Sequence, residues 1–304
     1  MINKPKILVL IAAYNGEQYI KEQLDSILAQ TNVQVSILIS LDKSLDKTPD
    51  IISEYTSKHS NIQDLGNTTR FGSAGRNFIE LIIKSDISKY DYISFSDQDD
   101  IWLAEKLSKA VDTIKLKKID AYSSNVTAFW DDGKEKLIIK DYSQVKYDYL
   151  FESAGPGCTF VFTKTLFSEI QSHLLSKKAD FKDFGVHDWY CYSFARHNNF
   201  KWYISSDSLM RYRQHSTNVT GANIGLKGFK SRLKQLWTGS YFFKVKQQAL
   251  FIGQSEKPII LLKSKDRMAM LRLAAIAHQC TRNPFNKIMF ILVCCLMFIK
   301  GNKL

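Results

Sequence analysis

Several common sequence signals are missing from this chain of 304 residues. No G-x-G-x-x-G follows the first expected strand and no G-x-x-x-x-G-K-[ST] occurs anywhere, which argues against a dinucleotide-binding Rossmann site and against a P-loop. There is no Pro/Ser/Gly-rich linker and no block repeated at a fixed period. The N-terminus has no arrangement of charged region, apolar region and cleavage site, so we expect a protein that is not secreted.

The cysteines also show no spacing that is typical of a disulfide framework or a zinc site. The five cysteines form no C-x-x-C or zinc-type spacing, and their number is odd. We therefore expect reduced, partly buried thiols in a cytosolic protein. The residues concerned are Cys158, Cys191, Cys280, Cys294 and Cys295.

Acidic residues are scarce in the C-terminal quarter. The segment from Leu226 to Leu304 holds 15 Lys and Arg but only Glu256 and Asp266, which gives it a charge of +13 against −1 for residues 1–225. Such a basic segment favours an anionic partner, either a nucleic acid, a membrane surface or a phosphate-bearing acceptor. A simple solvated surface is the alternative.

The first hundred residues alternate short apolar runs with helical periods. Apolar runs predict strands, and apolar residues at helical spacing predict helices between them. This β-α-β-α order is typical of a doubly wound, mainly parallel sheet. The strands are expected at 6–13, 33–41 and 90–96, and the helices at 17–30, 51–58 and 76–84.

The remaining pattern is less regular. We expect helices at 102–115 and 187–196, strands at 121–130, 158–163 and 202–205, and a loop over 212–225. After Leu226 the spacing predicts helices at 226–237 and 266–279. The final apolar run, 288–299, would form a helix of roughly 18 Å, shorter than the roughly 30 Å hydrocarbon core. It is interpreted either as a buried docking helix or as a segment that dips into a membrane.

Polar residues follow three of the expected strands. They are Tyr14-Asn15, Asp42 and the acidic run Asp97-Gln98-Asp99-Asp100. Ligands of open α/β sheets bind beyond the carboxyl ends of the strands. Three carboxylates within four residues repel one another unless a cation balances them, and Mg²⁺ or Mn²⁺ would neutralise a leaving diphosphate. The alternative is an acidic N-cap for the helix expected at 102–115.

These motifs, taken in order, resemble a family 2 glycosyltransferase over roughly residues 5–220. The resemblance implies a GT-A fold, an α/β architecture with a mostly parallel sheet flanked by helices. We then expect two parts: a GT-A domain over residues 1–225 and a basic, mainly helical extension over residues 226–304. The matching pieces are Ala13–Gly16, Ser40–Asp46, Asn67 through Arg76-Asn77, Asp97–Trp102, Gly155–Thr159, His187-Asp188-Trp189 and Tyr212–His215.

The resemblance also implies roles for particular residues. Asp188 would be the general base of an inverting transfer, and Asp99 and His215 would hold a Mn²⁺ or Mg²⁺ ion. Nucleotide-sugar binding would fall to Ala13, Tyr14, Asn15, Asp42, Arg76, Asp97 and Gly157, with Asp42 at the base and Asp97 toward the ribose. One departure concerns the base pocket, because Leu41-Asp42-Lys43 stands where the family usually has two acids and a glycine.

The subgroup is indicated by Tyr212–His215 with Asn218-Val219 and Gly221, together with His187-Asp188-Trp189. These resemble bacterial rhamnosyltransferases of surface polysaccharides, which implies dTDP-β-L-rhamnose as donor. We expect a glycan or lipid-linked acceptor, no nucleic acid, and a cytoplasmic enzyme bound to the anionic inner face of the plasma membrane. The alternatives are a UDP-hexose transferase, a Mg²⁺-dependent nucleotidyltransferase or phosphohydrolase, and a non-catalytic membrane-associated binding protein.

Overall fold

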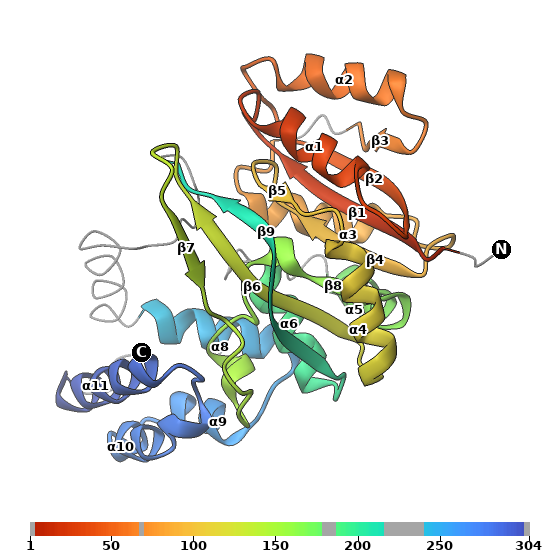
Figure 1. Ribbon diagram of the computed structural model, residues 1–304. Coiled ribbons are helices and arrows are strands. Elements are labelled where there is room, and N and C mark those ends of the chain that lie inside the picture. Colours follow the sequence, from red (N-terminus) through yellow and green to blue (C-terminus); the bar gives the residue numbers. More distant parts are fainter. Residues whose placement is uncertain (1–3, 67–69, 178–186, 216–239, 301–304) are drawn as a thin grey trace.

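The computed structural model describes residues 4–66, 70–177, 187–215 and 240–300. Within these residues one nine-stranded sheet runs through the molecule, with helices on both of its faces (Figure 1). The strand order is β3-β2-β1-β4-β8-β6-β9-β5, and β7 lies outside this order and pairs with β6. The strands β3, β2, β1 and β4 are parallel to one another. In contrast, β8 is antiparallel to β4 and β6, β7 is antiparallel to β6, and β5 is antiparallel to β9. The predicted α/β fold is confirmed.

The strands are β1 Lys6–Ala13, β2 Gln34–Leu41, β3 Ile62–Asp64, β4 Tyr92–Ser96, β5 Ile101–Trp102, β6 Ala121–Phe129, β7 Glu135–Ile138, β8 Val161–Thr163 and β9 Trp202–Arg213. The α-helices are α1 Ile20–Leu28, α2 Thr48–Lys58, α3 Ala74–Lys84, α4 Lys106–Lys117, α5 Lys164–Ser176, α6 His187–His197, α8 Ser240–Ile252, α9 Lys257–Lys263, α10 Met268–Ala275 and α11 Pro284–Lys300. Short 3₁₀ turns lie at η1 Asp148–Leu150, η2 Gly157–Thr159 and η4 Ala277–Gln279.

The sheet separates two apolar clusters. Alternate residues of β1 point to opposite faces, so Ile7 and Val9 join one cluster and Leu8 and Leu10 join the other. The first cluster is completed by α1, α2 and α4, and the second by α3, α5 and α6. Because β1 is buried on both faces, its sequence reads as one continuous apolar run, as expected of a central parallel strand.

Several predicted boundaries are wrong, most of them because strand pairing overrides local periodicity. The helix expected from Trp102 begins only at Lys106, since Ile101 and Trp102 form β5 against Arg211 and Met210 of β9. The acidic run therefore does not cap this helix, whose N-cap is Glu105.

The short strand expected at 202–205 is part of a longer strand, β9, that runs on to Arg213, so the first two residues of the loop expected over 212–225 are extended. The strand is longer because β9 stays paired with β6 up to the Phe129–Arg213 register. Residues 216–225 of that expected loop lie outside the described residues. The strand expected at 158–163 begins with the η2 turn and becomes extended only at Val161.

The C-terminal helices α8–α11 lie together at one end of the molecule (Figure 1). Their buried residues Phe242, Ile259, Leu273 and Phe290 belong to the same apolar cluster as α3, α5 and α6. The helix expected at 226–237 and the proposed boundary at 225/226 lie outside the described residues. The helix expected at 266–279 is interrupted after Ala275.

The apolar run 288–299 is part of α11, whose inner side is buried. None of the helices that the structure describes is long and apolar enough to cross a bilayer.

A buried ionic network fastens α11 to the rest of the protein. Arg282, just before α11, donates its backbone N–H at 2.7 Å and its Nε at 3.2 Å to Glu152 Oε1, and its guanidinium also donates to the Ser153 carbonyl. Its Nε lies 3.5 Å from Oδ2 of Asp148, a fully buried carboxylate that also accepts from Arg196 at 3.1 Å. Each cation here is needed to compensate a buried anion.

We expect Arg282→Met to destabilise the protein. Removing one partner leaves an uncompensated buried charge, which costs about 3 kcal/mol. The free energy of unfolding should fall by this amount in guanidinium denaturation. Arg272→Met is the matched control, because Arg272 is exposed and its ion pair with Asp266 is also at the surface. Equal effects of the two substitutions would contradict the structural role given to Arg282.

Candidate active site

The carboxyl ends of β1, β2 and β4 lie side by side and form one edge. The N–H of Asp42, after β2, donates to the Ala13 carbonyl at the end of β1 over 2.8 Å. The amide of Gln98, after β4, holds the backbone of Tyr14 in both directions, accepting its N–H at 2.8 Å and donating to its carbonyl at 2.9 Å. The predicted convergence of the three polar strand ends is therefore observed.

The turn after β1 is fixed in shape. Asn15 adopts a left-handed conformation with φ of 44°, accepts the Leu45 N–H at 2.9 Å and donates its own N–H to Ser44 Oγ at 3.0 Å. A Cβ on Gly16 would lie 2.5 Å from Oε1 of Gln98, so a larger residue here would displace the amide that holds Tyr14. The turn leaves the ring of Tyr14 43% exposed at the edge.

Asp42 is buried, and its carboxylate organises the neighbouring loop. It accepts the backbone N–H groups of Lys43 at 2.7 Å, Phe71 at 3.0 Å and Gly72 at 2.9 Å. This loop leads into α3, where Ser73 caps the helix by accepting the Arg76 N–H at 3.3 Å. Arg76 itself is exposed at the first turn of that helix.

The acids of the run after β4 each have a different environment. Oδ2 of Asp99 lies 2.7 Å from Nε2 of His215, and the two side chains are 14% and 13% exposed. Asp100 is fully buried and accepts the Arg213 N–H at 3.0 Å. His215 is further fixed by stacking on Tyr19, with ring centroids 5.0 Å apart. Asp99 thus faces the site, whereas Asp100 supports the turn from behind.

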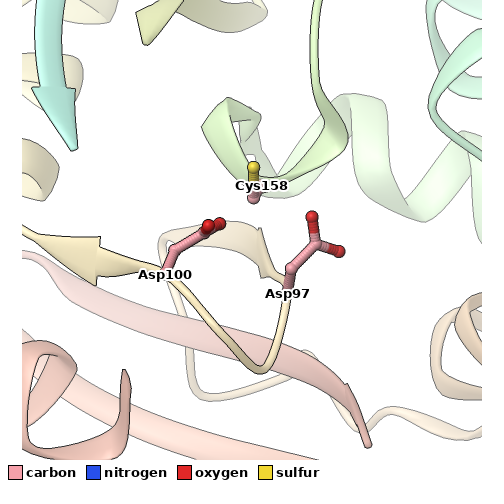
Figure 2. Close-up of side chains that lie close together, drawn as sticks. All are labelled: Asp97, Asp100 and Cys158. Atoms are coloured by element: carbon pink, nitrogen blue, oxygen red, sulfur yellow. The ribbon is translucent and has the colours of Figure 1, made fainter. Parts of the chain in front are cut away.

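Cys158 joins this acidic turn from the opposite side of the site. Its thiol and the carboxylates of Asp97 and Asp100 can all lie within 4.8 Å of one another (Figure 2). Burial, reinforced by the charge of Asp99, raises the pKa of Asp97 to about 7. Burial also raises the pKa of Asp100 and that of the Cys158 thiol well above their ordinary values. The cluster therefore tends to hold protons unless a cation replaces them.

A buried lysine lies behind the same cluster. Nζ of Lys106 sits 3.4 Å from the centroid of the Trp102 ring and has no hydrogen-bond partner in the part of the chain that the structure describes. Burial lowers the pKa of Lys106 to about 7, while Cys158 and Asp100 oppose that shift. Neither Cys158 nor Lys106 was predicted as a site residue. The only signal was the position of Cys158 directly after Gly157 in the glycine loop.

Asp188 lies in the first turn of α6 and faces the acidic turn. Burial raises the pKa of Asp188 to about 6, opposed by a 2.5 Å hydrogen bond from the Trp189 N–H and by the charge of Lys140. The charge of Asp188 in turn raises the pKa of Asp97, so the two carboxyl groups interact across the site. A carboxyl group with a pKa near 6 is suited to accept a proton near neutral pH.

His187, next to Asp188, is a neutral buried imidazole. Its ring stacks on Phe78 with centroids 3.8 Å apart, and burial lowers its pKa to about 3. Its two nitrogens have no hydrogen-bond partner within the described ranges. Gly157 lies against this pair, because a Cβ there would be 2.7 Å from Nε2 of His187 and 3.2 Å from Cβ of Asp188. The glycine loop and the start of α6 are thus in direct contact.

The two side chains Asp99 and His215 could bind a divalent cation. Asp99 offers a carboxylate oxygen, which suits Mg²⁺ and Mn²⁺, and His215 offers a ring nitrogen, which favours a transition metal such as Mn²⁺ over Mg²⁺. Asp100 also has one buried oxygen, Oδ2, without a hydrogen-bond partner among the described residues. The pair Asp99 and His215 was predicted as a metal-binding pair. The structure brings them together across 116 positions of sequence.

Arg213 and Gln98 were quoted in motifs but given no role. Arg213 donates its Nε to the Asp99 carbonyl at 2.9 Å and its guanidinium to Glu22, so it ties β9 to the acidic turn and to α1. Gln98 holds the β1 turn as described above. Both residues hold other parts of the site in position. The available sequence signal was that Gln98 stands between Asp97 and Asp99, and that Arg213 stands two positions before His215.

A GT-A-like sheet with an acidic turn at its carboxyl edge and a carboxylate facing it defines a glycosyltransferase that uses nucleotide sugars. The family model of glycosyl transferase family 2 matches residues 8–173. This chain belongs to that family.

Two relatives agree with this assignment, and a solved structure shares the fold. The chain is 44% identical over 227 residues to the dTDP-rhamnosyl transferase RfbG of Shigella flexneri, covering 74% of this chain and 78% of that protein. It is 34% identical over 119 residues to WfaP of Escherichia coli, named a UDP-Glc:alpha-D-GlcNAc-diphosphoundecaprenol beta-1,3-glucosyltransferase, covering 39% and 45%. TarS of S. aureus, solved with UDP-GlcNAc, shares the fold with a TM-score of 0.56, 14% identity and coverage of 98% and 88%.

We expect Gly157→Ala to lower kcat/KM about 100-fold, because a displacement of the adjacent His187–Asp188 pair misaligns the reacting groups. Steady-state kinetics with the active donor measures this. Gly133→Ala in the β6–β7 turn is the control: its φ of 81° predicts a loss of stability, but no atom lies within 4 Å of the added Cβ. Unchanged kinetics for Gly157→Ala would show that the contact is not required.

Proposed function

We propose that the protein transfers L-rhamnose from dTDP-rhamnose to a hydroxyl group of a growing, lipid-linked surface polysaccharide, with inversion at the anomeric carbon. The observation that carries this proposal is that Asp188 faces the acidic turn Asp97–Asp100, with Asp99 beside His215. The choice of sugar is supported by the likeness to RfbG over most of the chain.

The donor would lie along the carboxyl edge of the sheet. Tyr14 and Asp42 would line the pocket of the base, together with Ala13 and Asn15. Arg76 at the start of α3 would contact the nucleotide, and Asp97 would contact the ribose. Gly157 would belong to the loop beside the donor sugar. Asp42 already accepts three backbone N–H groups, so any contact with the ring N–H of thymine would be an additional hydrogen bond.

Asp99 and His215 would hold a Mn²⁺ or Mg²⁺ ion. Enzymes of this family generally use a divalent metal ion, and the ion supplies positive charge that stabilises a leaving diphosphate. Two further side chains would hold Asp99 and His215 in position: Arg213 donates a hydrogen bond to the Asp99 carbonyl, and Tyr19 stacks on the His215 ring.

Asp188 would act as the general base. It takes the proton of the acceptor hydroxyl while that oxygen forms a bond to the anomeric carbon and the bond from that carbon to the diphosphate oxygen breaks. The raised pKa of Asp188 makes it a better proton acceptor than an exposed carboxylate. Such a single base, placed opposite the leaving group, gives inversion.

The enzyme would work at the cytoplasmic face of the plasma membrane, as a peripheral protein attached to anionic lipid. This location matches a lipid-linked acceptor and a nucleotide-sugar donor. It is supported by the basic composition of the C-terminal quarter.

We expect Asp188→Asn to lower kcat about 10³-fold, because loss of a general base costs this order of magnitude. Affinity for dTDP should stay unchanged by calorimetry. In the wild type, kcat/KM should rise with pH and level off above about 6, since the carboxyl group must be ionised to accept a proton.

Asp112→Asn, on an exposed position of α4, is the matched control and should keep both the rate and the pH profile. Wild-type transfer by Asp188→Asn would overturn the assignment of the base and favour another acid.

A donor panel tests the substrate. With dTDP-rhamnose, dTDP-glucose, UDP-glucose and UDP-GlcNAc, each with Mn²⁺ or Mg²⁺, we expect nucleotide diphosphate release chiefly from dTDP-rhamnose and only when the metal is present. Preference for UDP-glucose, the donor in the name of WfaP, would instead favour a hexose transferase. No release from any donor, with or without a lipid acceptor, would overturn the enzymatic proposal.

A further inference from the structure

The outer side of α11 is an exposed apolar surface. Its buried side consists of Phe290, Val293, Cys294 and Met297. The opposite side, called here the α11 outer face, consists of Phe285, Ile288, Leu292, Leu296 and Ile299, and Ile288 and Ile299 are 59% and 72% exposed. The helix carries no charge between Lys287 and Lys300. When a helix is apolar on all sides but packs against the protein on one side, its opposite side remains an exposed apolar surface.

The helices around α11 carry a positive surface. Exposed basic residues on or between α8–α11 are Lys244, Lys257, Lys263, Lys265, Arg267, Arg272 and Lys300. The two acids of this region do little to balance them. Glu256 is held by Tyr149 and His197, each at 2.8 Å, and Asp266 lies 3.6 Å from Arg272. The apolar run of α11 is flanked by Lys287 and Lys300 on the same helix, and an apolar helix face with basic residues at its ends and in the neighbouring helices complements an anionic lipid surface.

We propose that the α11 outer face inserts into the headgroup layer of an anionic bilayer, with α11 lying along the surface. Its 17 residues span about 25 Å, a length that suits a helix lying in the interface. A second copy of the chain is a poorer occupant, because two such surfaces would bring like charges together around the apolar contact.

This surface is rigidly connected to the catalytic base. Arg282, just before α11, binds Glu152 and the Ser153 carbonyl. The Ser153 hydroxyl donates to the Gly155 carbonyl at 3.0 Å, in the loop whose Gly157 lies against Asp188. On the other side, Tyr241 of α8 stacks on Trp189, the neighbour of Asp188, with ring planes 9° apart. Binding of α11 to lipid therefore fixes the position of Asp188 relative to the membrane. This inference rests on the proposed attachment to anionic lipid and names the surface that makes it, whereas it does not depend on the proposed sugar transfer.

Vesicle flotation of the full-length protein tests the proposal. The vesicles contain phosphatidylcholine with phosphatidylglycerol, or phosphatidylcholine alone. We expect wild type to float with the anionic vesicles and Ile288→Glu/Leu292→Glu to bind at least about tenfold more weakly, because the charges oppose insertion. Leu116→Glu/Leu137→Glu is the matched control, since these leucines on α4 and β7 are 83% and 50% exposed. It should bind as wild type does.

Other outcomes overturn the proposal. Equal flotation of wild type and Ile288→Glu/Leu292→Glu would show that another surface binds, and absence of wild-type binding would exclude the bilayer. If sedimentation velocity shows a wild-type dimer that this variant dissociates, a second copy covers the face. Nucleotide release with water as acceptor should be the same in the variant and in wild type. Loss of flotation with normal release therefore separates this proposal from the proposed sugar transfer.

Discussion

Repulsion among carboxylates in one short turn is the constraint on which the site depends. Asp97, Asp99 and Asp100 follow β4 within four residues, at an edge where burial strengthens their mutual repulsion. The acids have different surroundings: Asp99 lies beside the His215 ring, Asp100 accepts the Arg213 N–H, and the Cys158 thiol lies close to both Asp97 and Asp100. The partners come from η2 and from the end of β9, so satisfying the turn requires these distant segments to meet.

This distribution of partners also separates chemical roles. Asp99 remains open to the site, whereas Asp100 is fully enclosed and carries a strongly raised pKa. Asp188, approaching from α6, has a pKa that burial raises to about 6, and it is the proton acceptor in the proposed reaction. Carboxyl groups at one edge of the sheet thus differ in pKa, because burial and neighbouring charges differ from one position to the next.

The helical C-terminus is part of the same physical unit. Arg282 neutralises the buried acids Asp148 and Glu152 of the segment that borders the base, and α8 packs behind Trp189. The arrangement leaves α11 with one covered and one uncovered apolar side. In the proposed membrane-bound state the same helix would connect the lipid surface to the start of α6.

Local sequence determined the central strands, the alternation of β and α elements and the order of the motifs, because a strand buried on both faces must be apolar throughout and its end must be polar. It also singled out Asp97, Asp99, Asp188 and His215, although their roles rested on resemblance. Tertiary structure alone decided that Trp102 pairs in β5, that β9 extends to Arg213, and that Cys158 and Lys106 lie close to the acidic turn. These features depend on pairing and burial between segments far apart in the chain, which local periodicity does not record. The same holds for α11, because its sequence is apolar on every side and only packing determines which side stays exposed.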